Sequence, residues 1–206
     1  MRKLQFLILF VFFGAVTSVP AQDMRTIFRE APDEIFPLLT KNLRADLVDF
    51  VDAGMKAKVT NDFDGVSVLE CMDDDYLLLA TTASSTMQLK LLPLHGDTIM
   101  CAVKSVKAEA TDSRILFYDL DWNVIDGNAM FVQPAIKDFF MPGVAAGKAI
   151  DMCDIYLVSL ALNANDNTLV AEYTMPAYMS AEDAAKVTPL LRQLVYRWNG
   201  ERFVIE

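Results

Sequence analysis

Histidine is almost absent from the sequence: among 206 residues, His95 is the only one. A single histidine excludes metal sites that need two imidazoles, and a Ser-His-Asp triad could use no other residue. His95 precedes Gly96 and Asp97, which are typical of a turn, and no serine lies in a Gly-x-Ser-x-Gly sequence. Glycine-rich phosphate loops, Cys-x-x-Cys pairs and His-Glu-x-x-His helices are also missing. We therefore predict no catalytic residue, no cofactor site and no metal site, and enzymes that carry no sequence motif stay open.

Cysteine is scarce too. The three cysteines, Cys71, Cys101 and Cys153, are too few and too widely spaced for a disulfide framework or a zinc site. Each lies in or beside an apolar run, as buried small hydrophobic residues do. An oxidising compartment would allow at most one bridge within the chain, and we predict Cys71 with Cys101 because both lie in the first sheet region.

Basic residues are outnumbered. Lysine and arginine number 18 against 28 aspartate and glutamate residues, which gives a formal net charge of −10. Proteins that bind nucleic acid neutralise phosphates with clustered lysine and arginine. We therefore predict no nucleic-acid partner.

The first 21 residues have the parts of a secretory signal peptide. Arg2 and Lys3 supply positive charge, residues 4–16 are apolar apart from Gln5, and Ala21 ends a small-residue cleavage sequence. A membrane anchor is the alternative, but this stretch of thirteen residues is shorter than the roughly 20 that a spanning helix needs. We predict cleavage after Ala21, a periplasmic or secreted protein, and no stable membrane insertion afterwards. Loss of Arg2 and Lys3 leaves 16 basic against 28 acidic residues and a formal net charge of −12.

Residues 22–206 are predicted to form a single domain, or two halves, 22–125 and 126–206, that share one core. The clearest pattern runs from Met87 to Ile125, where three alternating stretches follow one another between short turns. In the first of them apolar residues alternate with Gln88 and Lys90, which predicts a strand with one buried face. Further strands are expected at 56–60, 66–71, 76–82, 122–125, 156–162 and 169–175.

The last predicted element is a hairpin around Asn199-Gly200, a dipeptide typical of a two-residue type I′ turn. Such a turn pairs Trp198 with Glu201, Tyr196 with Phe203 and Leu194 with Ile205. Arg197 and Arg202 then lie on the other face.

Helical patterns flank these strands. Residues 23–54 read as short helices, with Asp23 as the first N-cap and a last helix capped by Asn42 and ended by Gly54. Arg44 lies away from the apolar stripe of that last helix. Further helices are expected at 134–142 and 180–189. Because most strands are joined by hairpin-length connections, the predicted class is α+β: antiparallel β-meander sheets with helices packed on one face.

Three clusters of charged residues are candidate sites. Asp119, Asp121 and Asn123 are spaced as in the opening of a calcium loop, but the EF-hand glycine and glutamate positions hold Val124 and Met130. An aspartate-rich turn explains them better.

The adjacent residues Asp73, Asp74 and Asp75 point to alternate faces of an extended chain, which indicates a solvated turn rather than a metal or catalytic cluster. A third group, made of arginines, has two interpretations: it pairs with nearby carboxylates, or it holds an anionic ligand or a partner. Its members are Arg192, Arg197 and Arg202.

Several stretches resemble a family of uncharacterised exported proteins from Bacteroidales-type bacteria. They are 23–25, 50–56, 91–98, 112–119 and 134–140, with the sequences DMR, FVDAGMK, LLPL followed by GDT, DSRI followed by FYD, and PAIKDFF. The resemblance covers nearly the whole chain after residue 21. The family is classed as a domain of unknown function, so the resemblance implies a Gram-negative envelope setting but supplies no catalytic residue.

Composition and compartment favour a non-enzymatic binding or interaction module of the cell envelope, with an envelope protein or a small ligand as its partner. A sheet covered by helices on one face only would leave its other face free for that contact. The alternative is a hydrolase whose carboxylates come together from distant strands. A deep pocket with two facing carboxylates would favour the hydrolase.

Overall fold

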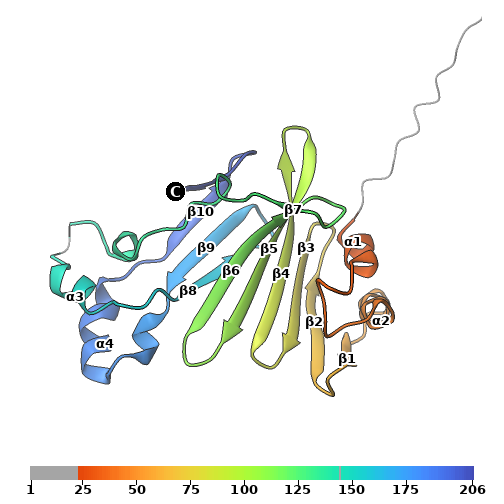
Figure 1. Ribbon diagram of the computed structural model, residues 1–206, viewed down its shortest axis with the longest axis horizontal. Coiled ribbons are helices and arrows are strands. Elements are labelled where there is room, and N and C mark those ends of the chain that lie inside the picture. The colour runs from red at the N-terminus through yellow and green to blue at the C-terminus, as the bar shows by residue number, and fades with distance from the viewer. Residues whose placement is uncertain (1–22, 144) are drawn as a thin grey trace, which may run out of the picture.

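A computed structural model describes residues 23–143 and 145–206 (Figure 1). The predicted signal peptide, with its cleavage after Ala21, lies outside the described residues. Within those residues, no helix is long and apolar enough to cross a membrane.

The larger sheet is a seven-stranded antiparallel meander in which each strand pairs with the next along the chain. Its strands are β1 (Lys58–Thr60), β2 (Val66–Met72), β3 (Tyr76–Thr82), β4 (Ser85–Leu94), β5 (Asp97–Lys107), β6 (Thr111–Tyr118) and β7 (Val124–Ile125). His95 and Gly96, with φ angles of 51° and 91°, form the two-residue turn between β4 and β5. The strands predicted between residues 56 and 125 and the antiparallel α+β class are confirmed.

Both faces of this sheet are buried. On β5, Ile99, Cys101 and Val103 face one core while Met100 and Ala102 face another. A fully apolar run of this kind is typical of a strand covered on both sides. The expectation of a free sheet face is therefore wrong.

Two helices cover one face: α1 (Met24–Glu30) and α2 (Lys41–Asp52). Asp23 caps α1 as predicted, since its carboxylate accepts a hydrogen bond from the Thr26 amide at 2.9 Å. The cap of α2 is Thr40 and not Asn42, because the Thr40 hydroxyl accepts from the Leu43 amide.

Arg44 on α2 is completely buried, contrary to its predicted outward position. Its guanidinium donates to the carbonyl oxygens of Phe28, Ala31 and Leu39 and to the carboxylate of Asp33. Arg44 thus satisfies backbone carbonyls at the end of α1 and in the loop that joins the two helices, where no regular hydrogen-bond ladder can do so.

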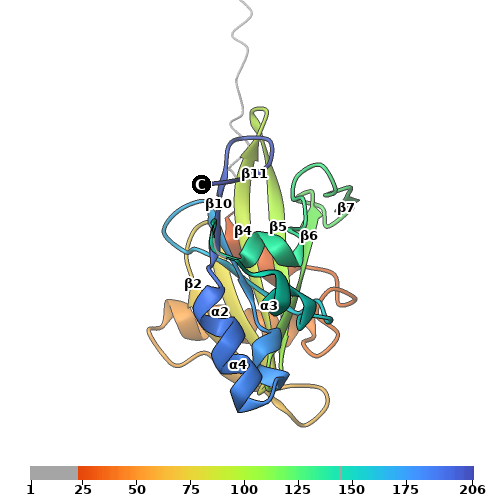
Figure 2. The same ribbon diagram turned by 90° about the vertical axis from the view of Figure 1, so that its left-hand side faces the viewer.

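A four-stranded antiparallel sheet covers the other face, with strand order β11-β10-β9-β8 (Figures 1 and 2). Its strands are β8 (Val158–Leu162), β9 (Thr168–Tyr173), β10 (Leu194–Trp198) and β11 (Phe203–Ile205). The helices before and between them are η1 (Ile136–Phe139), α3 (Gly147–Asp151), η2 (Met175–Tyr178), α4 (Ala181–Val187) and η3 (Thr188–Leu190). The helix predicted at 134–142 is only the short 3₁₀ turn η1.

The register of the last hairpin differs from its prediction by two residues. Trp198 pairs with Phe203 and Tyr196 with Ile205, so the loop has four residues instead of two. The Asn199 side chain causes this, because its oxygen accepts from the amides of Glu201 and Arg202 at 3.0 and 2.9 Å.

Side chains of the larger sheet form hydrogen bonds with the edge of β8 that has no neighbouring strand. Three alternate amides of β8 donate to them, and these bonds are Val158 N to Asp112 Oδ1 (3.3 Å), Leu160 N to Ser113 Oγ (3.0 Å) and Leu162 N to Gln88 Oε1 (2.8 Å). Lys90, 2% exposed, donates to the Ala164 carbonyl at 2.9 Å. The polar residues of β4 therefore lie between the two sheets and satisfy an edge that would otherwise have unpaired groups.

Candidate functional site

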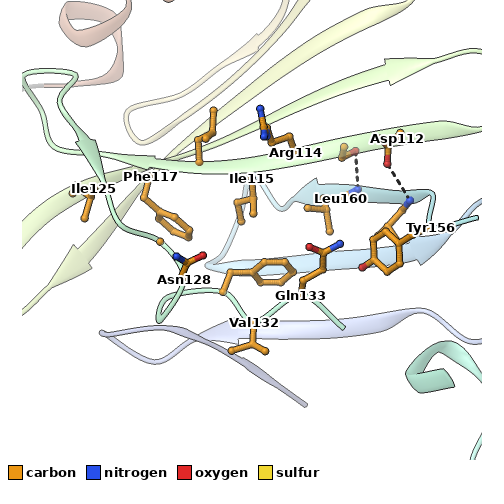
Figure 3. Close-up of a pocket in the computed structure, with 15 residues that line it drawn as sticks. Asp112, Arg114, Ile115, Phe117, Ile125, Asn128, Val132, Gln133, Tyr156 and Leu160 are labelled. Atoms are coloured by element: carbon orange, nitrogen blue, oxygen red, sulfur yellow. Dashed lines mark hydrogen bonds between the residues drawn. The ribbon is translucent and has the colours of Figure 1, made fainter. Parts of the chain in front are cut away.

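A cavity of about 840 Å³ lies beside β6 (Figure 3). Its lining comes from β6, from β8 and the preceding Tyr156, and from β7 and the segment that follows it. Apolar and polar side chains both contribute to its inner surface. The apolar ones include Ile115, Phe117, Ile125, Phe131, Val158 and Leu160, and the polar ones include Asp112, Arg114, Asn128 and Gln133. Its volume is within the range of natural ligand pockets.

The cavity runs along the edge of β6 rather than over one face. Its lining includes all six consecutive residues from 112 to 117. Because successive side chains of a strand point to opposite faces, a hollow on one face would contact only every second residue. Figure 3 shows Arg114 on one side of the strand, with Ile115 and Phe117 on the other.

Part of this edge has no backbone partner. The outward-facing positions are the odd-numbered ones, since the Asp119 amide donates to the Asn123 carbonyl at 3.0 Å. At one end of the edge β7 covers Phe117, and at the other end the Thr111 carbonyl accepts from the Thr174 hydroxyl at 2.6 Å. Between them lie Ser113 and Ile115. No hydrogen bond found among the described residues uses the backbone N–H or C=O of these two.

Gly127 sets the course of the far wall. A Cβ at this position would lie 2.3 Å from the Phe117 ring, so only glycine lets the chain cross the ring so closely. The amides of Met130 and Phe131 then both donate to the Gly127 carbonyl. This turn ends β7 after two residues and leaves the rest of the β6 edge uncovered.

Tyr156 and Asp112 lie at one end of the cavity (Figure 3). Burial raises the pKa of the Tyr156 phenol, and the carboxylates of Asp112 and Asp138 raise it further. The Tyr156 hydroxyl donates to the Pro134 carbonyl at 3.0 Å. Asp112 is the one carboxylate among the lining residues, and it already accepts from the Val158 amide.

A second hollow of about 520 Å³ lies near the β5–β6 turn. Two carboxylates, Glu109 and Glu172, line it together with Arg192. Glu172 accepts from the Gln193 amide group at 3.5 Å.

His95 is at the tip of the β4–β5 hairpin and lines neither hollow. Its side chain is 67% exposed, and its Nδ1 lies 3.9 Å from the carboxylate of Glu201. The prediction of His95 as a turn residue is confirmed.

The aspartate-rich stretches are turns. Asp119 accepts from the amides of Asp121 and Asn123 and from the Asn123 side chain, each at 2.9 Å. These bonds hold the pKa of Asp119 below its usual value. Among the described residues, no three His, Cys, Asp or Glu side chains are placed to hold a metal ion.

The side chains of Asp73, Asp74 and Asp75, which follow β2, point to different partners. Asp74 pairs with Arg25 at 3.4 Å, and Asp75 pairs with buried Lys90 at 2.9 Å. Asp73 accepts from the Cys71 thiol instead. The three carboxylates therefore do not converge on one point.

The C-terminal arginines do not form one group. Arg197 pairs with the carboxylate of Glu206 at 2.5 Å, and Arg192 donates to the Asp138 carbonyl at 3.3 Å. Arg202 is exposed in the hairpin loop.

All three cysteines are free thiols, and the predicted Cys71–Cys101 bridge is wrong. Cys71 is on β2 and Cys101 on β5, so two strands separate them. Three strand spacings amount to about 14 Å, more than twice the usual Cα distance of a disulfide. Burial raises the pKa of each thiol.

The sequence patterns did not point to the cavity. Its distinguishing features are an unpaired strand edge and a glycine packed on an aromatic ring, and both depend on where the chain goes after β7. Gly127-Asn128 was the available signal, since a glycine before an asparagine marks a turn.

The fold and this cavity define a class: an α+β protein of three layers, helices, large sheet and small sheet, with an open strand edge beside a hollow. A family model described as "Protein of unknown function (DUF3256)" matches residues 16–203, so the chain belongs to that family. This confirms the resemblance to uncharacterised proteins.

A solved structure of another protein has the same fold. It is described as a domain of an uncharacterized protein from Porphyromonas gingivalis W83, and the comparison covers 90% of this chain and 100% of that chain. The TM-score is 0.79 and the sequence identity is 23%. No functionally curated protein matches the chain.

Proposed function

We propose that this protein is a non-enzymatic binding module of the cell envelope, and that the cavity along β6 is its binding site. The observation that carries the proposal is the combination of a hollow lined by both apolar and polar side chains with an open strand edge. Hydrophobic walls with a few oriented polar groups are typical of binding pockets. The one carboxylate of the lining, Asp112, is engaged in holding β8.

The test compares two neighbouring substitutions in the far wall. Asn128 lines the cavity, whereas Ala129 is exposed and does not. Asn128→Trp places a large ring in the hollow, and Ala129→Trp is its matched control. Immobilised wild-type protein and both variants are incubated with an envelope fraction, and the bound molecules are identified by mass spectrometry.

We expect one partner to be retained by the wild type and by Ala129→Trp and to be lost with Asn128→Trp. Equal retention by all three proteins would contradict the assignment of the site. Thermal unfolding of both variants checks that the fold is kept.

A hydrolase is the second candidate, because Glu109 and Glu172 line one hollow. A chromogenic glycoside panel tests it with Glu172→Gln and the wild type. Turnover that Glu172→Gln abolishes would replace the binding proposal by the enzymatic one.

Export is part of the proposal. The charged and apolar pattern of residues 2–21 supports secretion to the periplasm or the cell exterior, in the Gram-negative setting that the sequence resemblance implies. N-terminal sequencing of protein from the exporting cells should find Gln22 first. A retained Met1 would contradict removal of the signal peptide.

A further inference from the structure

The free edge of β6 offers four unpaired backbone groups in a row. Ser113 and Ile115 each direct one N–H and one C=O away from β5, and these groups face the cavity. Native proteins normally cover or block an edge of this kind. The chain instead holds it open through the turn at Gly127.

We propose that β6 accepts an extended peptide of another protein as an additional antiparallel strand, and that this peptide carries a basic residue next to Asp112. The proposal rests on the binding function above and names its ligand. Such strand addition takes its affinity from main-chain hydrogen bonds and its specificity from pockets for alternate side chains.

The structure limits the length of the added strand. At one end β7 already pairs with Phe117 and Tyr118, and at the other end Thr174 occupies the Thr111 carbonyl. The open stretch is therefore residues 112–116. At about 3.4 Å per residue, a peptide segment of four or five residues fills it.

The pleat of β6 decides which side chains of the peptide are buried. Residues opposite Ser113 and Ile115 lie on the same face as those two, so their side chains enter the part of the hollow that Ile115, Val158 and Leu160 line. The same peptide residues direct their N–H groups to β6, since directly opposite partners exchange both bonds. The intervening residues face the side of Arg114 and need not be apolar.

Charge favours a basic partner. The chain has a formal net charge of −10. The lining holds one cation, Arg114, which lies on the side of the strand opposite Ile115 (Figure 3), and one carboxylate, Asp112. Asp138 lies near the same end, where its charge acts on Tyr156. In an antiparallel arrangement the carboxyl end of the peptide reaches this corner. A lysine or arginine there would interact with the carboxylates of Asp112 and Asp138 and with the Tyr156 ring.

The probe is a synthetic eight-residue peptide that alternates valine with threonine and ends in lysine. Amide exchange of the ¹⁵N-labelled protein is followed by NMR with and without it. The Arg114 and Leu116 amides, bonded to β5, should exchange slowly in both states. The Ser113 and Ile115 amides should exchange fast in the protein alone. With peptide their exchange rates should fall at least about tenfold, because a hydrogen bond must then open before exchange.

Two N-methylated peptides separate strand addition from other binding. Methylation of the valines removes the donors to β6 and should weaken binding at least about tenfold, whereas methylation of the threonines should change it little. Equal effects of both would overturn the proposal. Replacing the peptide lysine by norleucine should weaken binding only about two- to fivefold, because exposed ion pairs contribute modestly. In Asp112→Asn the two peptides should bind equally, because the carboxylate that pairs with the lysine is gone.

Binding of the neutral fluorophore N-phenyl-1-naphthylamine in the cavity, lost with Asn128→Trp, together with no peptide binding, would overturn strand addition but keep the proposed function. If neither the fluorophore nor the peptide binds, strand addition and the proposed binding function are both contradicted. A concentration-dependent dimer in sedimentation velocity that protects Ser113 and Ile115 without peptide would show that a second copy occupies the edge, and would also overturn the proposal.

Discussion

At the scale of single residues, the buried cations are the strongest structural features. Arg44 has no exposed surface and serves three backbone carbonyls at once. A buried charge without its partners lowers the stability of the folded state, and so do buried hydrogen-bond acceptors without a donor.

Arg44→Ala should therefore lower the free energy of unfolding by about 3–5 kcal/mol, since it leaves those carbonyls and Asp33 without their donor. Urea denaturation followed by fluorescence measures the change. Arg25→Ala is the control, because Arg25 forms partly exposed ion pairs with Asp52 and Asp74 and should cost less than about 1 kcal/mol. Similar losses in the two variants would contradict the role of Arg44.

Tyr76 makes stability sensitive to alkali. Burial raises its pKa to about 12. The folded state then binds the phenolic proton more tightly than the unfolded state, whose pKa is about 10. Its contribution is complete below pH 10 and falls as the pH rises toward 12.

We expect the urea midpoint to decline from pH 10 upwards and the decline to be shallower in Tyr76→Phe. Tyr196, whose pKa burial also raises to about 12, maintains part of the decline in that variant. An identical slope in wild type and Tyr76→Phe would contradict the assignment.

Residue identity alone could not reveal Arg44 or Lys90 as buried. Arg44 lies outside the apolar stripe of its helix, and Lys90 alternates with leucines as a solvent-facing residue would. Both are buried because distant segments supply partners: the loop between α1 and α2 for Arg44, and Asp75 with the Ala164 carbonyl for Lys90.

At the scale of elements, the contact between β8 and the larger sheet decides how the two sheets are joined. The edge of β8 is satisfied by side chains and not by another strand. Gln88 is the most buried member of this set, and its oxygen lies 2.8 Å from the Leu162 amide.

Gln88→Met should destabilise the fold by about 1–3 kcal/mol, because it keeps the side-chain volume but leaves the Leu162 amide buried and unpaired. Gln193→Met serves as control, since Gln193 is exposed, and should change stability by less than about 0.5 kcal/mol. Faster exchange of the Leu162 amide should accompany the loss in Gln88→Met. An unchanged amide would show that another acceptor replaces Gln88.

Prediction of the helices and strands succeeded where the alternation of apolar residues and the turn residues indicate the same element. The meander from β1 to β7 follows from alternation and from turns such as His95-Gly96. It failed where a side chain competes with the backbone: Asn199 accepts two amides and enlarges its hairpin loop, and Thr40 takes the cap expected of Asn42. The open edge of β6 needs the path of residues 126–133, which local patterns do not contain.

At the scale of the whole molecule, the larger sheet joins two cores. Trp122 packs with Phe36 and Tyr118 in the core beneath the helices. Trp198 packs with Phe117 and Phe203 in the core between the sheets. The chain has just these two tryptophans, so each core has its own fluorescent reporter.

Because β5 contributes to both cores, we expect Trp122→Phe and Trp198→Phe to unfold each in one transition, with the same midpoint by fluorescence and by circular dichroism. Probe-dependent midpoints within either variant would show that the halves 22–125 and 126–206 unfold independently. That result would decide between one domain and two.

The β4–β5 hairpin has a practical consequence. Figure 1 shows it projecting beyond the body of the molecule, and a Cβ at Gly96 would meet nothing within 4 Å. Extra residues inserted at this tip would add only a small chain-closure term, about 0.6 kcal/mol for each doubling of loop length. A biotin-acceptor sequence placed there would fix every molecule to a sensor chip in one orientation, with the sandwich standing clear of the surface.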